Sequence, residues 1–130
     1  MGNVQTINKV TYETIQEISL HRRDTFMICT ISSEKEKYVI LNTVPISKEE
    51  SIINDLIVNR QFQKKIIIYG ENMYDERIIK KYNQLKTFGF QNCYIYFGGL
   101  FEWILLQDVY GTELFPTNSI SINGCLDFKP

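Results

Sequence analysis

Three cysteines and one histidine are the side chains of this 130-residue chain best suited to nucleophilic or metal chemistry: Cys29, Cys93, Cys125 and His21. A thiolate is a strong nucleophile and, like imidazole, a common zinc ligand. The cysteines are odd in number, widely spaced and form no Cys-x-x-Cys pair, which argues against a disulfide framework and a structural zinc site. We therefore expect no metal, no cofactor and a reducing, cytoplasmic setting.

None of these four side chains stands in a known catalytic motif. Cys29 and Cys93 lie within apolar runs of β-type residues, so we expect small buried hydrophobic residues there and not reactive thiols. Cys125 lies in a glycine-containing tail that carries no supporting motif. His21 adjoins two arginines, and the chain has no Gly-x-Ser-x-Gly sequence, so we expect an ordinary surface histidine.

The composition is that of a globular chain with almost balanced charge. Hydrophobic residues make up 44% and charged residues 22%, and the formal net charge is −1. These values exclude a disordered chain and give no overall field that would attract nucleic acid. No apolar run is long enough to span a membrane. We expect one domain over residues 1–130 and no nucleic-acid partner.

The N-terminus carries one modification pattern. Residues 1–10 lack the apolar core of a secretory signal. Residues 1–6 match the N-myristoylation pattern, with Gly2 as the acceptor and Thr6 as the hydroxyl residue. The pattern is short and often matches by chance, and a single acyl chain gives only marginal membrane binding.

Strands alternate with helices along the chain. Short apolar runs predict strands at residues 25–31, 38–41, 65–69 and 93–97. The three consecutive isoleucines at 66–68 are typical of a central strand buried on both faces. Residues 119–122 fit either a short strand or an irregular tail. The alternation predicts an α/β domain with a parallel sheet.

Four helices connect these strands. The first is capped by Thr11, the second covers 48–59 with Ser47 and Glu50 as a capping box, and the fourth covers 100–109. The third begins at an Asp75 N-cap and ends before Gly89. Its basic residues, which we expect to form a solvated face and not a phosphate-binding one, are Arg77, Lys80, Lys81 and Lys86.

The segment where a domain of this class would bind a ligand is the loop after strand 65–69. In an open parallel sheet, ligands lie beyond the carboxyl ends of the strands, often against a helix N-terminus. We therefore expect the recognition site in this 70–76 loop, which consists of Gly70, Glu71, Asn72, Met73, Tyr74, Asp75 and Glu76.

Residues 65–117 resemble a rhodanese-like domain. The resemblance rests on the strand, loop and helix just described and on three elements that follow: Gly89-Phe90, the apolar run 92–96, and Gly98-Gly99-Leu100-Phe101-Glu102-Trp103 with Phe115-Pro116-Thr117 after it. It is weaker over residues 25–57. The resemblance implies a parallel sheet of about five strands with helices on both faces.

Active members of that family carry a cysteine first in the loop and an arginine five residues later. The cysteine takes up sulfane sulfur as a persulfide, and the loop N–H groups and the arginine hold the anionic donor. The resemblance aligns these two positions with Gly70 and Asp75, and residues 71–92 contain no cysteine. It therefore implies that the nucleophile is missing and that the charge of the anion-binding residue is reversed, which also argues against a cysteine phosphatase.

The resulting hypothesis is a pseudoenzyme, inactive as a sulfurtransferase, that acts as a binding or regulatory module. Its 70–76 loop and the adjacent surface would recognise a basic or polar partner. Two alternatives stay open. One is an active sulfurtransferase that uses a thiol outside the loop, for which Cys125 is the candidate. The other is a structural or oligomeric interaction protein.

Overall fold

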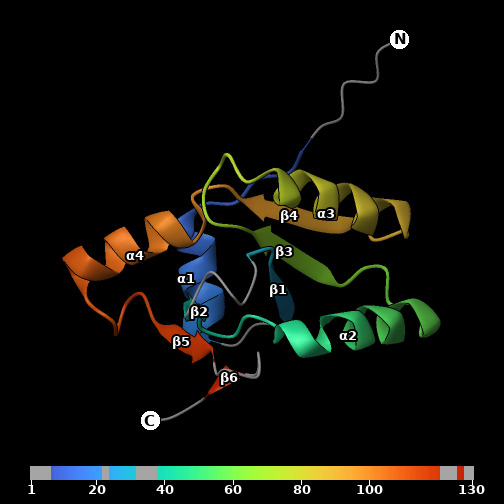
Figure 1. Cartoon of the computed structure of the whole chain (residues 1–130). Coiled ribbons are helices and arrows are strands. Elements are labelled where there is room, and N and C mark those ends of the chain that lie inside the picture. Colours follow the sequence, from blue (N-terminus) through green and yellow to red (C-terminus); the bar gives the residue numbers. More distant parts are fainter. Residues whose placement is uncertain (1–6, 22–23, 32–37, 121–125, 128–130) are drawn as a thin grey trace.

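A computed structural model describes residues 7–21, 24–31, 38–120 and 126–127. Gly2 and Cys125 lie outside these ranges, so the acylation pattern at Gly2 and the alternative that uses the Cys125 thiol stay untested. The elements follow in the order α1 (Tyr12–His21), β1 (Thr25–Cys29), β2 (Tyr38–Ile40), α2 (Ile46–Val58), β3 (Lys65–Tyr69), α3 (Glu76–Thr87), β4 (Asn92–Tyr96), α4 (Gly99–Tyr110), β5 (Thr117–Ile120) and β6 (Leu126–Asp127) (Figure 1).

A three-stranded parallel sheet with the order β1-β3-β4 lies at the centre of the molecule. β3 pairs along its whole length with both neighbours, and Ile66, Ile67 and Ile68 are fully buried. The central position of β3 and its bounds confirm the prediction from the isoleucine run. Because both pairings are parallel, the carboxyl ends of all three strands lie at one edge of the sheet.

The expectation of about five parallel strands is wrong: the described part of the chain forms a parallel sheet of three strands, and β2 does not join it. β2 pairs antiparallel with β5, which pairs antiparallel with β6, in a separate small sheet. Single bridges extend the parallel sheet at its two edges, between Met27 and Thr43 and between Lys9 and Ile95. β2 has three residues, and its hydrogen-bonding partner β5 lies more than seventy residues further along the chain.

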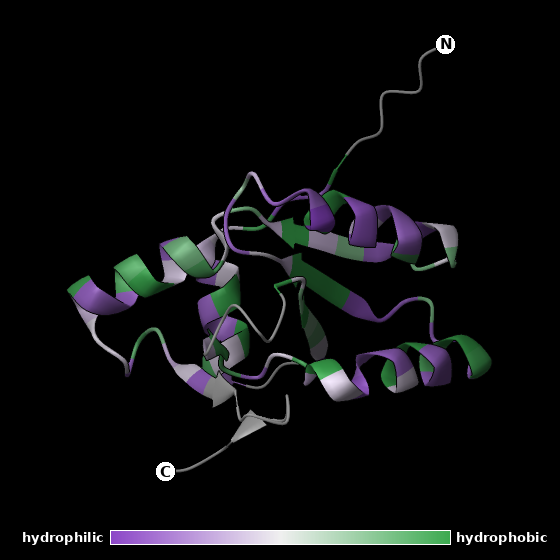
Figure 2. Cartoon of the chain, viewed as in Figure 1, coloured by the Kyte–Doolittle hydropathy of each residue, from purple (hydrophilic) through white to green (hydrophobic). Residues whose placement is uncertain are grey.

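Helices cover both faces of the parallel sheet, as expected. The two cores follow the alternation of side chains along β3. Ile67 and Tyr69 pack with residues of α1 and α4, whereas Ile66 and Ile68 pack with residues of α2 and α3. Figure 2 shows the contrast between the helices: α3 is largely hydrophilic on its visible side, and α4 shows hydrophobic residues there.

The helix ends show which capping predictions hold. Asp75 is the N-cap of α3 and accepts from the backbone N–H of Arg77, and Gly89 follows the helix with a φ of 111°. The predicted capping box of α2 is wrong. Pro45 is the N-cap, with its φ at −57° and no side-chain hydrogen bond, so Ser47 is already inside the helix.

The two described cysteines are placed as predicted. Cys93 is fully buried and Cys29 is almost fully buried. Among the described residues, no helix is both long and apolar enough to cross a bilayer.

Candidate functional site

The 70–76 loop lies at the carboxyl end of β3 and is held by three elements. It runs directly from Tyr69 into α3. On one side, the N–H of Thr30, just after β1, donates to the carbonyl of Tyr69 at 2.9 Å. On the other side, the N–H groups of Leu100 and Phe101, in the first turn of α4, donate to the carbonyls of Gly70 and Glu71, each at 2.9 Å. The loop backbone is therefore fixed from both sides.

Gly99 makes the contact between α4 and the loop possible. Its φ is 64°, in the left-handed region that favours glycine. A Cβ at this position would lie 2.5 Å from the carbonyl oxygen of Gly70 and 2.9 Å from that of Glu71. Both the backbone angle and the space require glycine, which gives a physical reason for the second glycine of the Gly-Gly-x-x-x-Trp element.

The carboxylate of Asp75 turns into the loop and accepts hydrogen bonds from three residues. Oδ1 accepts from the backbone N–H of Arg77 at 3.1 Å and from its Nε at 2.9 Å. Oδ2 accepts from the guanidinium of Arg77 at 3.0 Å, from the hydroxyl of Thr30 at 3.2 Å and from the N–H of Glu71 at 3.3 Å. Only 6% of the side chain is exposed. The loop N–H of Glu71 and the guanidinium therefore converge on an anion, and that anion belongs to the chain itself.

The electrostatics of this pair follow from its hydrogen bonds. Partial burial acts to raise the pKa of Asp75, but the hydrogen bonds from Arg77 and Glu71 outweigh it and lower that pKa below its usual value. The hydrogen bonds from Arg77 to the carboxylate correspondingly raise the pKa of the guanidinium. The arginine is already engaged with a carboxylate in a bidentate geometry, the strongest kind of charge-assisted hydrogen bonding.

Gly70 leaves the space that this carboxylate fills. A Cβ at position 70 would overlap Oδ2 of Asp75, and it would lie 2.7 Å from Oγ1 of Thr30 and 2.9 Å from Cγ1 of Ile78. The φ of Gly70 is not positive, so close approach and not backbone conformation is what requires glycine here. A side chain at the first position of the loop would therefore require these neighbouring side chains to move.

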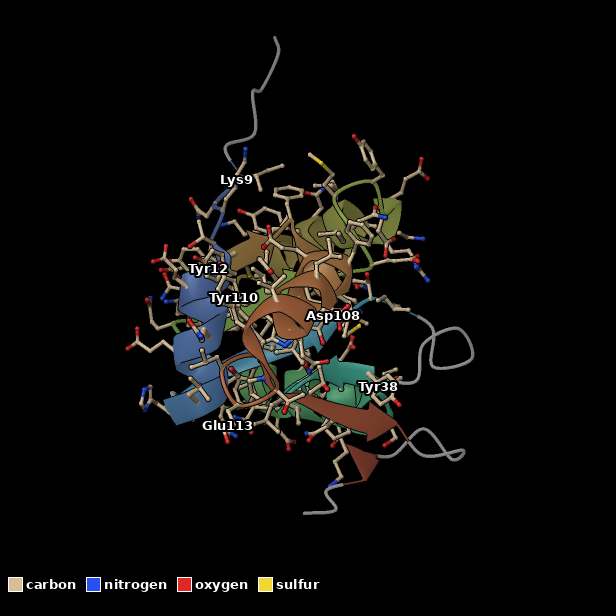
Figure 3. All side chains as sticks on the ribbon, turned by 90° about the vertical axis from the view of Figure 1, so that its left-hand side faces the viewer. Lys9, Tyr12, Tyr38, Asp108, Tyr110 and Glu113 are labelled. Carbon is tan, nitrogen blue, oxygen red and sulfur yellow. The ribbon has the colours of Figure 1, made fainter. Side chains whose placement is uncertain are left out.

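The outer part of the loop presents side chains to solvent. Asn72 accepts from the N–H of Tyr74 at 2.9 Å through Oδ1, which forms an Asx turn. Met73 and Tyr74 are exposed, Tyr74 by 82%. They form one wall of a groove of about 620 Å³, and Phe101 of α4 lies on the other side. α4 crosses the side of the molecule that faces the viewer in Figure 3.

The loop therefore divides into two parts. Gly70 is buried and the carboxylate of Asp75 turns inward beside it, whereas Asn72, Met73 and Tyr74 form an outward-facing tip. Glu71 and Glu76 are exposed. Of the three acidic residues of the loop, Glu71 and Glu76 present their charge to solvent, while the charge of Asp75 is balanced by Arg77.

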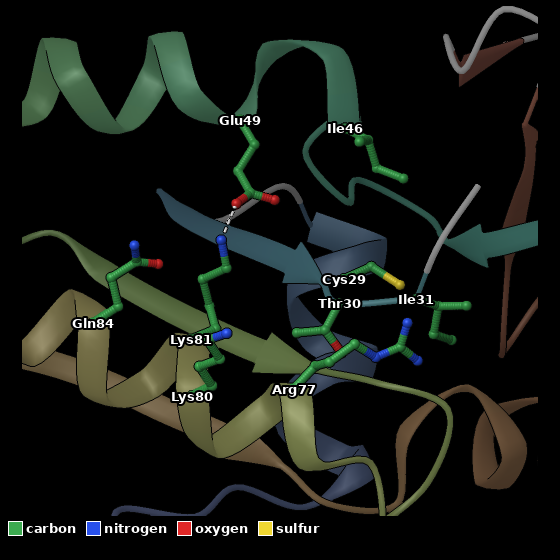
Figure 4. Close-up of a pocket in the computed structure, with 9 residues that line it drawn as sticks. All are labelled: Cys29, Thr30, Ile31, Ile46, Glu49, Arg77, Lys80, Lys81 and Gln84. Atoms are coloured by element: carbon green, nitrogen blue, oxygen red, sulfur yellow. Dashed lines mark hydrogen bonds and ion pairs between the residues drawn. The ribbon is translucent and has the colours of Figure 1, made fainter. Parts of the chain in front are cut away.

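A second hollow, of about 430 Å³, lies between α2 and α3 at the end of β1 (Figure 4). Sequence reasoning missed the residues that connect it to the loop. Thr30 and Arg77 line this hollow and also bind Asp75, and Cys29 lies beside them. The parallel register that places Cys29 next to Tyr69 brings the end of β1 to the loop. The strand predicted over residues 25–31 includes Thr30, but β1 ends at Cys29. The polar side chain of Thr30 near the end of an apolar run was the available signal.

The basic face of α3 is largely paired within the chain. Arg77 binds Asp75, and Nζ of Lys81 lies 2.6 Å from a carboxylate oxygen of Glu49 on α2. Nζ of Lys86 lies 5.9 Å from the ring centroid of Tyr82. Three of the four basic side chains of α3 therefore make contacts within the chain, and the expectation that this face does not bind phosphate stays a prediction.

The Cys93 thiol is buried, and its ionisation is suppressed. Burial raises the pKa of the Cys93 thiol to about 11, although Lys86 acts in the other direction. Within the described ranges, no group of three His, Cys, Asp or Glu side chains could hold a metal ion.

Comparison with known proteins finds similarity in structure but not in sequence. No protein-family model matches the chain, and no curated protein matches it significantly. The Alr3790 protein from Anabaena has a TM-score of 0.62 at 18% identity, over 88% of this chain and 83% of that one.

Two yeast proteins each match over 88% of this chain. The single-domain sulfurtransferase RDL2 of Saccharomyces cerevisiae has a TM-score of 0.55 at 14% identity over its full length. Ygr203w, a protein tyrosine phosphatase of the rhodanese family, has a TM-score of 0.57 at 13% identity over 94% of its length.

These identities are low enough that the likeness concerns the fold and not the activity. The solved structures include a rhodanese-like domain of the same Anabaena protein, with a TM-score of 0.51. The parallel sheet, its two helical layers and the loop at the end of β3 agree with that architecture. The chain has a rhodanese-like α/β fold.

Proposed function

We propose that this chain is a binding or regulatory module that is inactive as a sulfurtransferase and uses the 70–76 loop for recognition. One observation carries the proposal: the Asp75 carboxylate fills the space that a side chain on Gly70 would need. The resemblance places the family's cysteine at Gly70 and its arginine at Asp75. A loop built in this way has room for neither a thiol nor the sulfur it would carry.

The hydrogen bonds of the loop support the same conclusion. Persulfide chemistry needs a thiolate at the centre of the loop and free donors that hold an anionic sulfur compound. Here the N–H of Glu71 and the guanidinium of Arg77 already donate to Asp75. A thiosulfate ion would have to displace a carboxylate that is covalently attached and approach the exposed side chain of Glu71.

The tip of the loop supports a recognition role. Tyr74 is 82% exposed, and an Asx turn on Asn72 fixes the backbone that presents it. Exposed aromatic side chains on a rigid loop are typical contributors to protein interfaces. The acidic side chains of Glu71 and Glu76 would favour a basic or polar partner.

A thiosulfate:cyanide sulfurtransferase assay tests the proposal. We expect no turnover from the purified chain under conditions in which an active single-domain rhodanese turns over. Robust turnover that is lost in Cys29→Ser, Cys93→Ser or Cys125→Ser would overturn it. A persulfide detected on Cys125 by mass spectrometry would favour the alternative of a sulfurtransferase acting outside the loop.

A further inference from the structure

The outward face of α4 is apolar although solvent covers it. Phe101, Leu105 and Val109 are exposed by 60%, 50% and 72%. They lie four residues apart, so they form a straight stripe about 12 Å long on one side of the helix. The opposite side of α4 packs into the core through Leu100 and Trp103. A helix that is apolar on both sides needs a second covering surface.

This α4 stripe (Phe101, Leu105 and Val109) continues into the 70–76 loop. Met73 and Tyr74 line the groove of about 620 Å³ together with Phe101 and Leu105. A smaller hollow of about 280 Å³ lies against the same two stripe residues and is lined by Glu71. The stripe is therefore a ridge with a hollow on each side, a shape that a second helix can pack against.

The charged side chains around the α4 stripe are mainly acidic. The sequence has no Lys, Arg or His from residue 87 to residue 128. Asp108 and Glu113, labelled in Figure 3, are exposed, and Glu71 is exposed beside the groove. The residues that line the two hollows include no Lys or Arg. One cation lies near, since Nζ of Lys9 is 5.6 Å from the ring centroid of Phe97.

The acidic side chains beside the α4 stripe favour one kind of binding partner over two others. A second copy bound through the same stripe would bring Asp108 and Glu113 against their own counterparts, which is unfavourable. An anionic membrane surface would repel the same carboxylates. A helix with an apolar face and lysines or arginines beside it would match both the ridge and its acidic border.

We infer that the α4 stripe and the loop tip together bind a basic amphipathic helix of a partner protein. This inference rests on the proposed recognition role of the 70–76 loop, because Met73 and Tyr74 form one wall of the groove. The apolar stripe supplies the contact area, and the acidic border sets the orientation and the preference for a basic partner.

The experiment uses a fluorescein-labelled helical peptide of about 18 residues, since shorter isolated helices are marginally stable. The peptide has leucines along one face and lysines on the flanks, and a control peptide has glutamates in place of the lysines. Fluorescence anisotropy with the full chain is expected to give affinity at least about tenfold higher for the lysine peptide. Equal affinity for the two peptides would overturn the inference.

Variants locate the binding surface. Leu105→Gln is expected to weaken binding of the lysine peptide about tenfold. Val58→Gln is the matched control. Val58 is an apolar residue, 78% exposed, at the end of α2, which covers the opposite face of the parallel sheet from α4. Circular dichroism verifies that both variants fold. Equal effects of the two variants would overturn the assignment to α4.

Further readouts separate this inference from the proposed function. Amide NMR shifts that move only in residues 71–74 on peptide addition would keep the loop as a recognition site and overturn the α4 stripe. A dimer seen by light scattering and lost in Leu105→Gln would assign the stripe to a second copy and overturn the inference. Sulfurtransferase turnover would overturn only the proposed inactivity.

Discussion

Oδ2 of Asp75 lies in the space into which a side chain on Gly70 would project. The contact couples two positions five residues apart, one at the end of β3 and the other at the start of α3. The missing side chain at Gly70 makes room for the carboxylate, and the carboxylate in turn caps α3 and binds Glu71 and Arg77. Each of the two residues therefore restricts what the other can be.

A double-mutant cycle tests this coupling. Gly70→Ala is expected to destabilise the fold by about 1 to 3 kcal/mol, because its methyl group overlaps Oδ2. Asp75→Ala is expected to cost about 0.5 to 2 kcal/mol for the lost N-cap. The double variant should be more stable than the sum predicts, since removing the carboxylate relieves the overlap. Urea unfolding of the four proteins measures the difference.

A second pair of variants serves as the control for that cycle. A Cβ on Gly111 would have no neighbour within 4 Å. Gly111→Ala and Asp75→Ala are therefore expected to add within about 0.5 kcal/mol. If the effects of Gly70→Ala and Asp75→Ala on the free energy of unfolding also add, a Cβ on residue 70 and the Asp75 carboxylate do not compete for the same space.

The lowered pKa of Asp75 predicts how stability changes in acid. Because the folded chain binds this proton more weakly than the unfolded chain does, the contribution of Asp75 is complete above an unfolded pKa of about 4. It is lost as the pH falls through the lower pKa of the folded state. Wild type is therefore expected to lose stability below pH about 4 more steeply than Asp75→Asn does.

Thermal unfolding across that pH range provides the measurement. Asp24→Asn is the control, because Asp24 is 78% exposed and pairs with Lys64 at the surface, where an ion pair contributes little. It should leave the slope close to that of wild type. A slope for Asp75→Asn equal to that of wild type would show that Asp75 does not carry this pH dependence.

Local features of the fold could be predicted from the sequence. The run of isoleucines at 66–68 fixes β3 because only a position buried on both faces accepts three of them in succession. The N-cap role of Asp75 could be predicted because it depends on a hydrogen bond between its side chain and the backbone of the same helical turn. In both cases the deciding interactions lie within a few residues.

Features that depend on distant pairing could not be predicted in the same way. β2 pairs with β5, from Ile40 with Thr117 to Tyr38 with Ser119, and nothing in either short run indicates the other. The inward turn of Asp75 likewise depends on Thr30, which reaches the loop only because β1 lies in parallel register beside β3. The sequence therefore does not distinguish Asp75 from Glu71 and Glu76, although Asp75 forms an ion pair with Arg77.

Gly99→Ala is expected to displace the loop. The substitution combines a φ of 64° with contacts of 2.5 Å and 2.9 Å to backbone oxygens that cannot rotate away. We expect a loss of at least about 2 kcal/mol in the free energy of unfolding. The amide resonances of Leu100 and Phe101, whose N–H groups donate to the loop, should shift.

Comparison of Gly111→Ala with Gly99→Ala separates the cost of a positive φ from the cost of the steric contact with the loop. Gly111 also has a positive φ, 99°, but no atom lies within 4 Å of an added Cβ. It should destabilise the fold without shifting those two amide resonances. If Gly99→Ala leaves the resonances in place, the contact between α4 and the loop is not what requires glycine.

Burial of Cys93 predicts a thiol that does not react in the folded chain. With its pKa raised to about 11, only about one thiol in a thousand is ionised at pH 8, and the fully buried sulfur is inaccessible to reagent. Iodoacetamide at pH 8 should therefore alkylate the Cys93 peptide slowly in the native protein and rapidly in denaturant, as mass spectrometry can measure. Rapid native labelling would reveal a reactive thiol on β4 and weaken the case for an inactive module, because the proposed inactivity requires that the described thiols stay inert.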